Sequence, residues 1–266
     1  MGDYTPNLSL YKPSVHETGW GSLVSGNFDT IDNICRDSSI WSPDCPPATA
    51  SAFDDEFSDS SINSALWTEF DPGSVATVSE DVAGLKILLS GNAGTDFGGV
   101  YQSLQSGDFT YTTKLLVSTN YRNMYAHSGL FLMEGVTGSS GLYGILFNPV
   151  RGNYTQRYAV IYYSNYQTIS SEKDYEGIYY TTTSVYLRIR RNGTNYYFDW
   201  SSDGISWRML YTESSFPFTA SHIGILASCE DATYITSTKS TFFRYKNSDL
   251  GFDGILEGDR IGIERY

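Results

Sequence analysis

Apolar and polar residues alternate with a period of two through much of the chain after residue 50. The alternation is clearest in Tyr186-Leu187-Arg188-Ile189-Arg190, where Leu187 and Ile189 share one face and the arginines share the other. Because successive side chains of a strand point to opposite faces, this pattern predicts a β-strand with one buried face. Twelve strands are predicted, over residues 75–80, 85–90, 99–104, 109–118, 129–134, 143–148, 156–163, 185–191, 195–200, 207–211, 223–228 and 241–245.

Turn-forming residues separate these strands. Arg191-Asn192-Gly193-Thr194 contains the Asn-Gly pair of a tight hairpin turn, and Ser202-Asp203-Gly204 contains the equivalent Asp-Gly pair. The close spacing leaves no room for the helical crossovers that parallel strands need. The sequence therefore predicts an all-β fold, an antiparallel two-sheet jelly-roll sandwich over residues 51–246. The residues expected in its core are Trp67, Leu187, Ile189, Phe198, Ile225 and Phe243.

Residues 1–50 have a different character. They contain five of the eight prolines and only isolated apolar residues, so they bury little core of their own. We expect an extended arm with one short helix, where Phe28, Ile31 and Ile34 follow one another at three-residue spacing. Apolar anchors of this kind gain free energy by entering pockets on a partner. The predicted anchors are Tyr4, Leu8, Leu10, Trp20, Phe28 and Ile31.

The last segment, residues 247–266, alternates glycines with charged residues and carries seven large apolar residues. It is therefore less polar than a solvated tail. Two interpretations remain open at this point. The segment either clasps a neighbouring subunit or adds a strand to its own domain.

Charge and composition exclude several classes of function. Asp and Glu number 30 against 17 Lys and Arg, and the resulting net charge of −13 argues against a nucleic-acid partner. No stretch approaches the roughly 18 apolar residues of a membrane span. The N-terminus lacks the basic and apolar regions of a secretory signal, so we expect synthesis in a cytoplasm without export. Three cysteines, Cys35, Cys45 and Cys229, are too few for a disulfide framework.

Parts of the sequence resemble known families. Phe53-Asp54-Asp55-Glu56-Phe57, followed by Ser64-Ala65-Leu66-Trp67, is similar to the opening strand of concanavalin A-like lectin and glucanase jelly rolls. The hairpin over residues 185–207 and the Gly-rich strand His222-Ile223-Gly224-Ile225-Leu226-Ala227-Ser228 resemble later strands of that family. The arm, with Tyr4-Thr5-Pro6-Asn7-Leu8-Ser9-Leu10-Tyr11-Lys12-Pro13, resembles the N-terminal segment of bacteriophage fibre and appendage proteins. Together these resemblances imply a lectin-like domain displayed on a virion.

The function expected from these features is that of a non-enzymatic structural component of a phage particle. It would be a tail fibre, an appendage or a capsid-decorating protein whose lectin-like domain contacts the host surface or a glycan. Symmetric particles favour closed cyclic assembly, so a homotrimer is expected. The expected partners are other virion proteins, further copies of the chain and a cell-surface glycan, without nucleic acid or membrane. The alternative is a carbohydrate-active module, either a glycan-binding lectin or a glycan depolymerase.

Candidate catalytic chemistry is sparse. Glucanases of the resembled family carry Glu, Asp and Glu on one strand, in the pattern Glu-x-Asp-x-x-Glu or Glu-x-Asp-x-Glu. We identify neither pattern in the chain. The nearest acidic cluster, Asp54, Asp55, Glu56 and Asp59, lies on the opening strand, where a solvated edge or a cation-binding rim is the simpler interpretation. We therefore expect no catalytic residues.

Two kinds of binding site remain candidates. Exposed tyrosines can stack on sugar rings, although they can equally fill the faces of a sheet. The tyrosines proposed for glycan contact are Tyr121, Tyr125, Tyr163 and Tyr166. The resemblance also implies calcium as the one candidate cofactor, bound at a rim by carboxylates. The weak candidate ligands are Asp54, Asp55 and Asp96.

Overall fold

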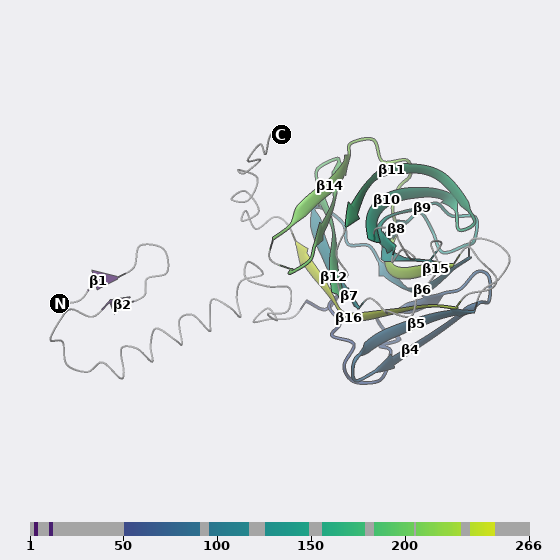
Figure 1. Ribbon diagram of the computed structural model, residues 1–266, viewed down its shortest axis with the longest axis horizontal. Coiled ribbons are helices and arrows are strands. Elements are labelled where there is room, and N and C mark those ends of the chain that lie inside the picture. The colour runs from purple at the N-terminus through teal and green to yellow at the C-terminus, as the bar shows by residue number, and fades with distance from the viewer. Residues whose placement is uncertain are drawn as a thin grey trace. The chain divides into compact units, whose positions relative to one another are not determined.

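The computed structural model (Figure 1) describes residues 3–4, 11–12, 51–90, 96–116, 126–148, 156–178, 184–204, 206–229 and 235–247. The chain divides into two compact units, Met1–Ala52 and Phe53–Tyr266. In the first unit β1 (Asp3–Tyr4) pairs with β2 (Tyr11–Lys12) in an antiparallel bridge that the predicted extended path did not include. The predicted short helix and the segment 248–266 lie outside the described residues.

The second unit consists of two antiparallel seven-stranded sheets, and its described residues contain no helix. The first sheet has the order β11 (Thr168–Ile178), β10 (Gln156–Asn165), β9 (Leu142–Asn148), β8 (Ala126–Met133), β15 (His222–Cys229), β6 (Asp96–Ser103) and β3 (Thr68–Phe70). The second sheet has the order β14 (Arg208–Glu213), β13 (Asn195–Ser201), β12 (Ser184–Asn192), β7 (Phe109–Leu116), β16 (Ile235–Asn247), β5 (Gly84–Ser90) and β4 (Ala76–Asp81). The predicted all-β sandwich is confirmed. No helix in the described part of the chain is long and apolar enough to cross a membrane.

All twelve predicted strands are present, as β4 to β10 and β12 to β16. The prediction missed two edge strands, β3 and β11. The sequence of β11, Thr168 to Ile178, is mostly polar and charged, because an edge strand buries few of its side chains. A pattern search based on buried alternation cannot detect such a strand.

The core between the sheets contains all six residues predicted for it, each at most 3% exposed. The contacts of Trp67 show how the opening segment is held in place. Its indole Nε1 donates a hydrogen bond to Asp55 Oδ2 (2.8 Å), and its ring packs edge-on against Phe243. The backbone of Asp55 forms an isolated bridge with Phe243, and Asp55 Oδ1 accepts a bond from the Phe57 amide. The acidic and aromatic residues of this motif therefore attach the segment to the second sheet.

The first sheet is strongly curved, as the arcs of β8 to β11 in Figure 1 show. The rings of Phe97 on β6 and Tyr163 on β10 are only 4.8 Å apart, although β15, β8 and β9 lie between their strands. In a flat sheet those two strands would be roughly 19 Å apart. The concave face of this sheet points away from the second sheet, and side chains from strands four positions apart in the sheet contact each other across it.

Glycines make this curvature sterically possible. On the concave face, large residues and glycines alternate both along the strands and across them. One cross-strand row reads Ile161, Gly144, Phe131, Gly224, Tyr101, and the next reads Ala159, Leu146, Gly129, Leu226, Gly99. Inward bending brings the side chains of the concave face together, so each large residue needs a neighbour without a Cβ. At Gly144 an added Cβ would lie 2.4 Å from Leu130 O and 2.5 Å from Phe131 Cδ1.

Candidate functional site

The hollow of the curved sheet is the first place to look for a ligand cleft. Its middle is occupied by the protein's own side chains, which form a second apolar core separate from the core between the sheets. Phe97, Phe131 and Tyr163 are fully buried there, in edge-to-face and tilted ring contacts. Tyr163 therefore offers no exposed ring for the sugar contact predicted for it. The middle of the concave face is a packed core and not an open cleft.

One end of this hollow is polar. His127 lies directly opposite Ser228, with 3.3 Å between Nδ1 and Oγ, and both residues are buried. Burial, with a smaller contribution from the positive charge of Arg157, lowers the pKa of His127 to about 3. The imidazole is consequently neutral at pH 7. Arg157 itself forms an ion pair with Glu172 of β11 at 3.3 Å.

The conclusion that the chain contains neither carboxylate pattern is wrong, because one stretch of the sequence matches. Glu172-Lys173-Asp174-Tyr175-Glu176 on β11 fits the pattern Glu-x-Asp-x-Glu. In a regular strand the three carboxylates would share one face. Val160 of β10 pairs with Asp174, however, whereas the next residue, Ile161, pairs with Glu172, so Lys173 is the extra residue of a β-bulge.

The bulge separates the carboxylates of this motif. Glu172 lies beside Ile161 on the concave face, whereas Glu176 lies beside Tyr158, on the side of the core between the sheets. Each of these two carboxylates is engaged by other residues. Glu172 pairs with Arg157, and Glu176 accepts hydrogen bonds from Trp200 Nε1 (2.8 Å) and from Arg208 Nη1 (2.6 Å). The motif therefore does not present its three carboxylates on one face: Asp174 and Glu176 share the side of the core between the sheets, and Glu172 lies on the other side.

The remaining residues predicted for binding sites are dispersed. Tyr121 and Tyr125 lie outside the described residues, as do all the predicted arm anchors except Tyr4, which is part of β1. Tyr166 is half-buried against the concave core. Among the candidate calcium ligands, Asp55 binds Trp67 and Phe57, Asp54 accepts a hydrogen bond from the Tyr245 amide (2.7 Å), and the side chain of Asp96 is not described. Within the described part of the chain, no three His, Cys, Asp or Glu side chains form a group that could hold a metal ion.

The outer face of the second sheet has a different composition. On β12, Val185, Leu187 and Ile189 point into the core, so Tyr186, Arg188 and Arg190 occupy the opposite face. Cross-strand pairing extends this face over four central strands. We call the twelve outward positions in these three rows the basic-aromatic face: Ser201, Tyr186, Lys114, Phe242; Asp199, Arg188, Thr112, Arg244; Tyr197, Arg190, Thr110, Lys246.

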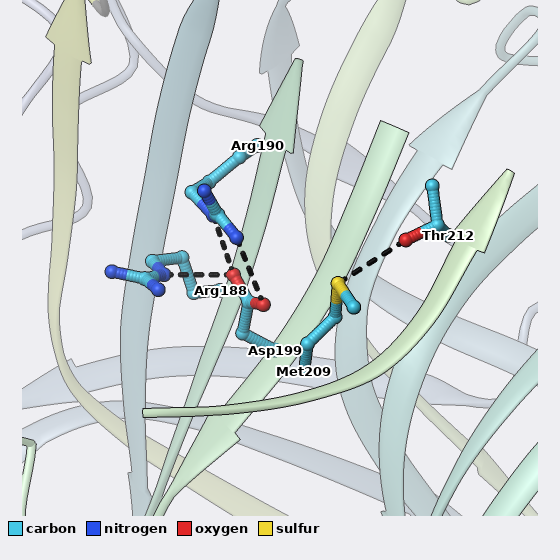
Figure 2. A network of polar contacts seen from close by, with 5 residues as sticks. All are labelled: Arg188, Arg190, Asp199, Met209 and Thr212. Carbon is cyan, nitrogen blue, oxygen red and sulfur yellow. Dashed lines mark hydrogen bonds and ion pairs between the residues drawn. The ribbon is translucent and has the colours of Figure 1, made fainter. Parts of the chain in front are cut away.

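A buried carboxylate organises the centre of the basic-aromatic face (Figure 2). Asp199 is 1% exposed, and Arg188 and Arg190 both bind it. Arg188 donates from Nε to Oδ2 at 2.9 Å, and Arg190 donates from Nε to Oδ2 at 2.7 Å and from Nη2 to Oδ1 at 3.2 Å. Two guanidinium groups therefore share one carboxylate. On the neighbouring strand, Thr212 donates a weak bond to the sulfur of Met209.

Aromatic rings support the cations of this face. The guanidinium of Arg188 lies 4.2 Å from the ring centroid of Trp207, which belongs to the loop before β14, and that of Arg190 lies 4.9 Å from Tyr197. Lys114 lies over Tyr186, and Arg244 lies over Phe242. Cation–π contacts of this type fix the position of a cation without neutralising its charge. Each of these four cations is therefore held against an aromatic ring.

Sequence reasoning missed this face, although a signal was present. The predicted turn at Asn192-Gly193 fixes the register of the hairpin between β12 and β13, and Gly193 adopts the positive φ of 59° that such a turn requires. That register places Arg188 opposite Asp199. The alternation had already placed the arginines on the face opposite Leu187. The hairpin register and the strand alternation together would have predicted the ion pair between Arg188 and Asp199.

Comparisons with known proteins bear on the fold. No family model and no curated protein matches the chain. Among solved structures, the chain is similar to the carbohydrate recognition domain of Emp47p (TM-score 0.50, 11% identity, 75% of this chain and 97% of that one). It is also similar to a prokaryotic β-1,3-1,4-glucanase from a mouse hindgut metagenome (0.50, 13%, 73% and 98%). A third similar structure is the exoplasmic/lumenal domain of VIP36 bound to Ca²⁺ and Man3GlcNAc (0.50, 8%, 75% and 91%). The second unit thus has the concanavalin A-like jelly-roll fold.

Proposed function

We propose that this chain is a non-enzymatic module that contacts a glycan on the host surface, carried on a phage particle as a tail fibre, appendage or capsid-decorating protein. The observation that carries the glycan contact is the basic-aromatic face. Sugar hydroxyl and acid groups are recognised by planar, rigidly held polar groups next to aromatic rings. The face provides such groups in Arg188 and Arg190, both held by Asp199, beside Trp207 and Tyr197.

The arrangement of carboxylates supports a role without catalysis. Hydrolysis of a glycosidic bond needs two carboxyl groups flanking that bond on one face. In the Glu-x-Asp-x-Glu match, the bulge at Lys173 places Glu172 on the face of β11 opposite Asp174 and Glu176. The two outer carboxylates, Glu172 and Glu176, are also engaged by other residues. The hollow in which a polysaccharide chain would lie is filled by Phe97, Phe131 and Tyr163.

The division of the chain supports mounting through the N-terminus. Residues up to Ala52 form a unit separate from the sandwich. The sequence places isolated apolar residues in that unit, among them Trp20 and Phe28, and such residues bind best in pockets of a partner. In this proposal the chain assembles as a homotrimer on the virion, and a rim calcium ion is its one candidate cofactor.

A glycan array tests the contact. The full-length protein is applied to neutral and acidic bacterial surface polysaccharides, and we expect retention on a subset of them. Reducing ends are measured in parallel on every retained polysaccharide. We expect none to be released, and release that is abolished by Glu172→Gln with Glu176→Gln would establish the depolymerase alternative. The absence of retention on any polysaccharide would contradict the proposed contact.

Particle assembly tests the mounting. Phage are produced with a chain carrying Trp20→Ala and Phe28→Ala, and the protein is quantified in purified particles. We expect loss of most copies, with the melting temperature of the purified variant unchanged. Incorporation at normal copy number would refute the role of the arm.

A further inference from the structure

The charge of the basic-aromatic face is opposite to that of the chain. Five of its twelve positions carry cations: Lys114, Lys246, Arg188, Arg190 and Arg244. Within the twelve, Asp199 is the one acidic residue, and Glu56 from the adjoining segment pairs with Arg244. The twelve positions therefore carry five cations and one carboxylate in a chain whose net charge is −13, and the carboxylates of Glu56 and Asp203 adjoin them. Such a concentration of one sign attracts ligands of the opposite sign.

The cations are also held in place before any ligand binds. Arg188 and Arg190 are each fixed twice, by Asp199 on one side and by the rings of Trp207 and Tyr197 on the other. Their side chains are 17% and 16% exposed, so they remain in contact with solvent while losing little entropy on binding. Guanidinium groups in a fixed plane match the geometry of a carboxylate.

We infer that the glycan bound by the basic-aromatic face is an acidic polysaccharide whose sugar rings carry carboxylate groups. This inference rests on the proposed glycan contact and specifies its ligand class. The ligand carboxylates lie over Lys114, Arg188 and Lys246, and sugar rings lie beside the half-buried Tyr197 and Trp207. A single-stranded nucleic acid is the competing polyanion, and the test includes it.

The experiment compares polygalacturonate with its carboxyl-reduced, neutral form. Binding of the full-length protein to each immobilised polymer is measured while NaCl is raised from about 0.05 to about 0.5 M. We expect binding to polygalacturonate that weakens at least about tenfold over this range, because counterions screen the contacts. The reduced polymer should bind at least about tenfold more weakly at low salt.

Matched variants locate the site. Lys114→Gln with Lys246→Gln removes two charges from the face without exposing Asp199, and we expect at least about a tenfold loss of affinity for polygalacturonate. Lys173→Gln with Arg208→Gln removes the same charge from the edges of β11 and β14, away from the face, and should change the affinity less than about twofold. Circular dichroism and thermal melting confirm that both double variants are folded.

The other outcomes discriminate between the two proposals. Equal binding of the neutral and acidic polymers, unaffected by the substitutions on the face, would overturn the acidic-glycan inference and leave the glycan contact intact. Binding to neither polymer nor to any polysaccharide of the array would overturn both. Single-stranded DNA that competes as strongly as polygalacturonate at equal charge would also overturn the inference, because the face would then recognise charge alone.

Discussion

The packed hollow of the first sheet can be tested by adding one methyl group, through Gly144→Ala. The new Cβ would lie 2.4 Å from the carbonyl oxygen of Leu130 and 2.5 Å from Cδ1 of Phe131. Ordinary contacts at a Cβ are longer than about 3.4 Å, so the backbone of two neighbouring strands must move by nearly 1 Å. No side-chain rotation can relieve the overlap with Leu130, because the obstructing atom belongs to the backbone.

Two opposing contributions set the size of the effect. Replacing Gly by Ala stabilises by about 0.4–1 kcal/mol through the lower entropy of the unfolded chain. Overpacking a buried site costs about 1–3 kcal/mol, and the backbone clash places Gly144 at the upper end. We therefore expect a net loss of about 1–3 kcal/mol, which lowers the melting temperature by about 3–10 °C for a unit of this size.

Urea denaturation and thermal melting of the full-length variant measure this loss. Gly135→Ala is the matched control, because the nearest atom to its new Cβ is the hydroxyl of Ser140, which can rotate away. That variant should melt within about 1–2 °C of the wild type. A Gly144→Ala variant that melts at or above the wild-type temperature would refute the closed concave face and would reopen the hollow as a ligand cleft.

Three further predictions concern polar groups. Asp199→Asn replaces the carboxylate that binds two arginines with a neutral amide. It should lower the free energy of unfolding, measured by urea denaturation, by about 2–4 kcal/mol. An unchanged urea midpoint would mean that water already solvates the cluster. His127, with a pKa lowered from 6.5 to about 3, stays neutral when folded, so stability should fall as the pH drops from about 6.5 toward 3. His127→Gln should make the free energy of unfolding less dependent on pH over this range. Identical pH profiles for the variant and the wild type would contradict the assignment to His127. Trp67→Phe removes the hydrogen bond to Asp55 and should cost about 1–3 kcal/mol by thermal melting, more than the same change at the half-buried Trp207.

Local pattern was sufficient to predict most of the secondary structure of this protein. Strand alternation is a property of consecutive residues, so Leu187 and Ile189 could be assigned to a core without knowing what covers them. The turn at Gly193 could be predicted because its positive φ is a local requirement. The edge strand β11 could not, since its residues are selected neither for burial nor for alternation.

The tertiary structure decided what each face of each sheet does. Glu172 and Glu176 have the spacing of a catalytic strand, but pairing with β10 introduces a bulge that directs them to opposite faces. From the sequence, Tyr163 is predicted to be an exposed tyrosine for glycan contact. The curvature of the sheet instead brings its ring against Phe97, a residue 66 positions earlier in the chain. Curvature and bulges arise from contacts between strands distant in sequence, and no local pattern encodes them. The residues that alternate in the sequence were therefore predictable, whereas the filled hollow and the composition of the basic-aromatic face followed only from the packing of the strands.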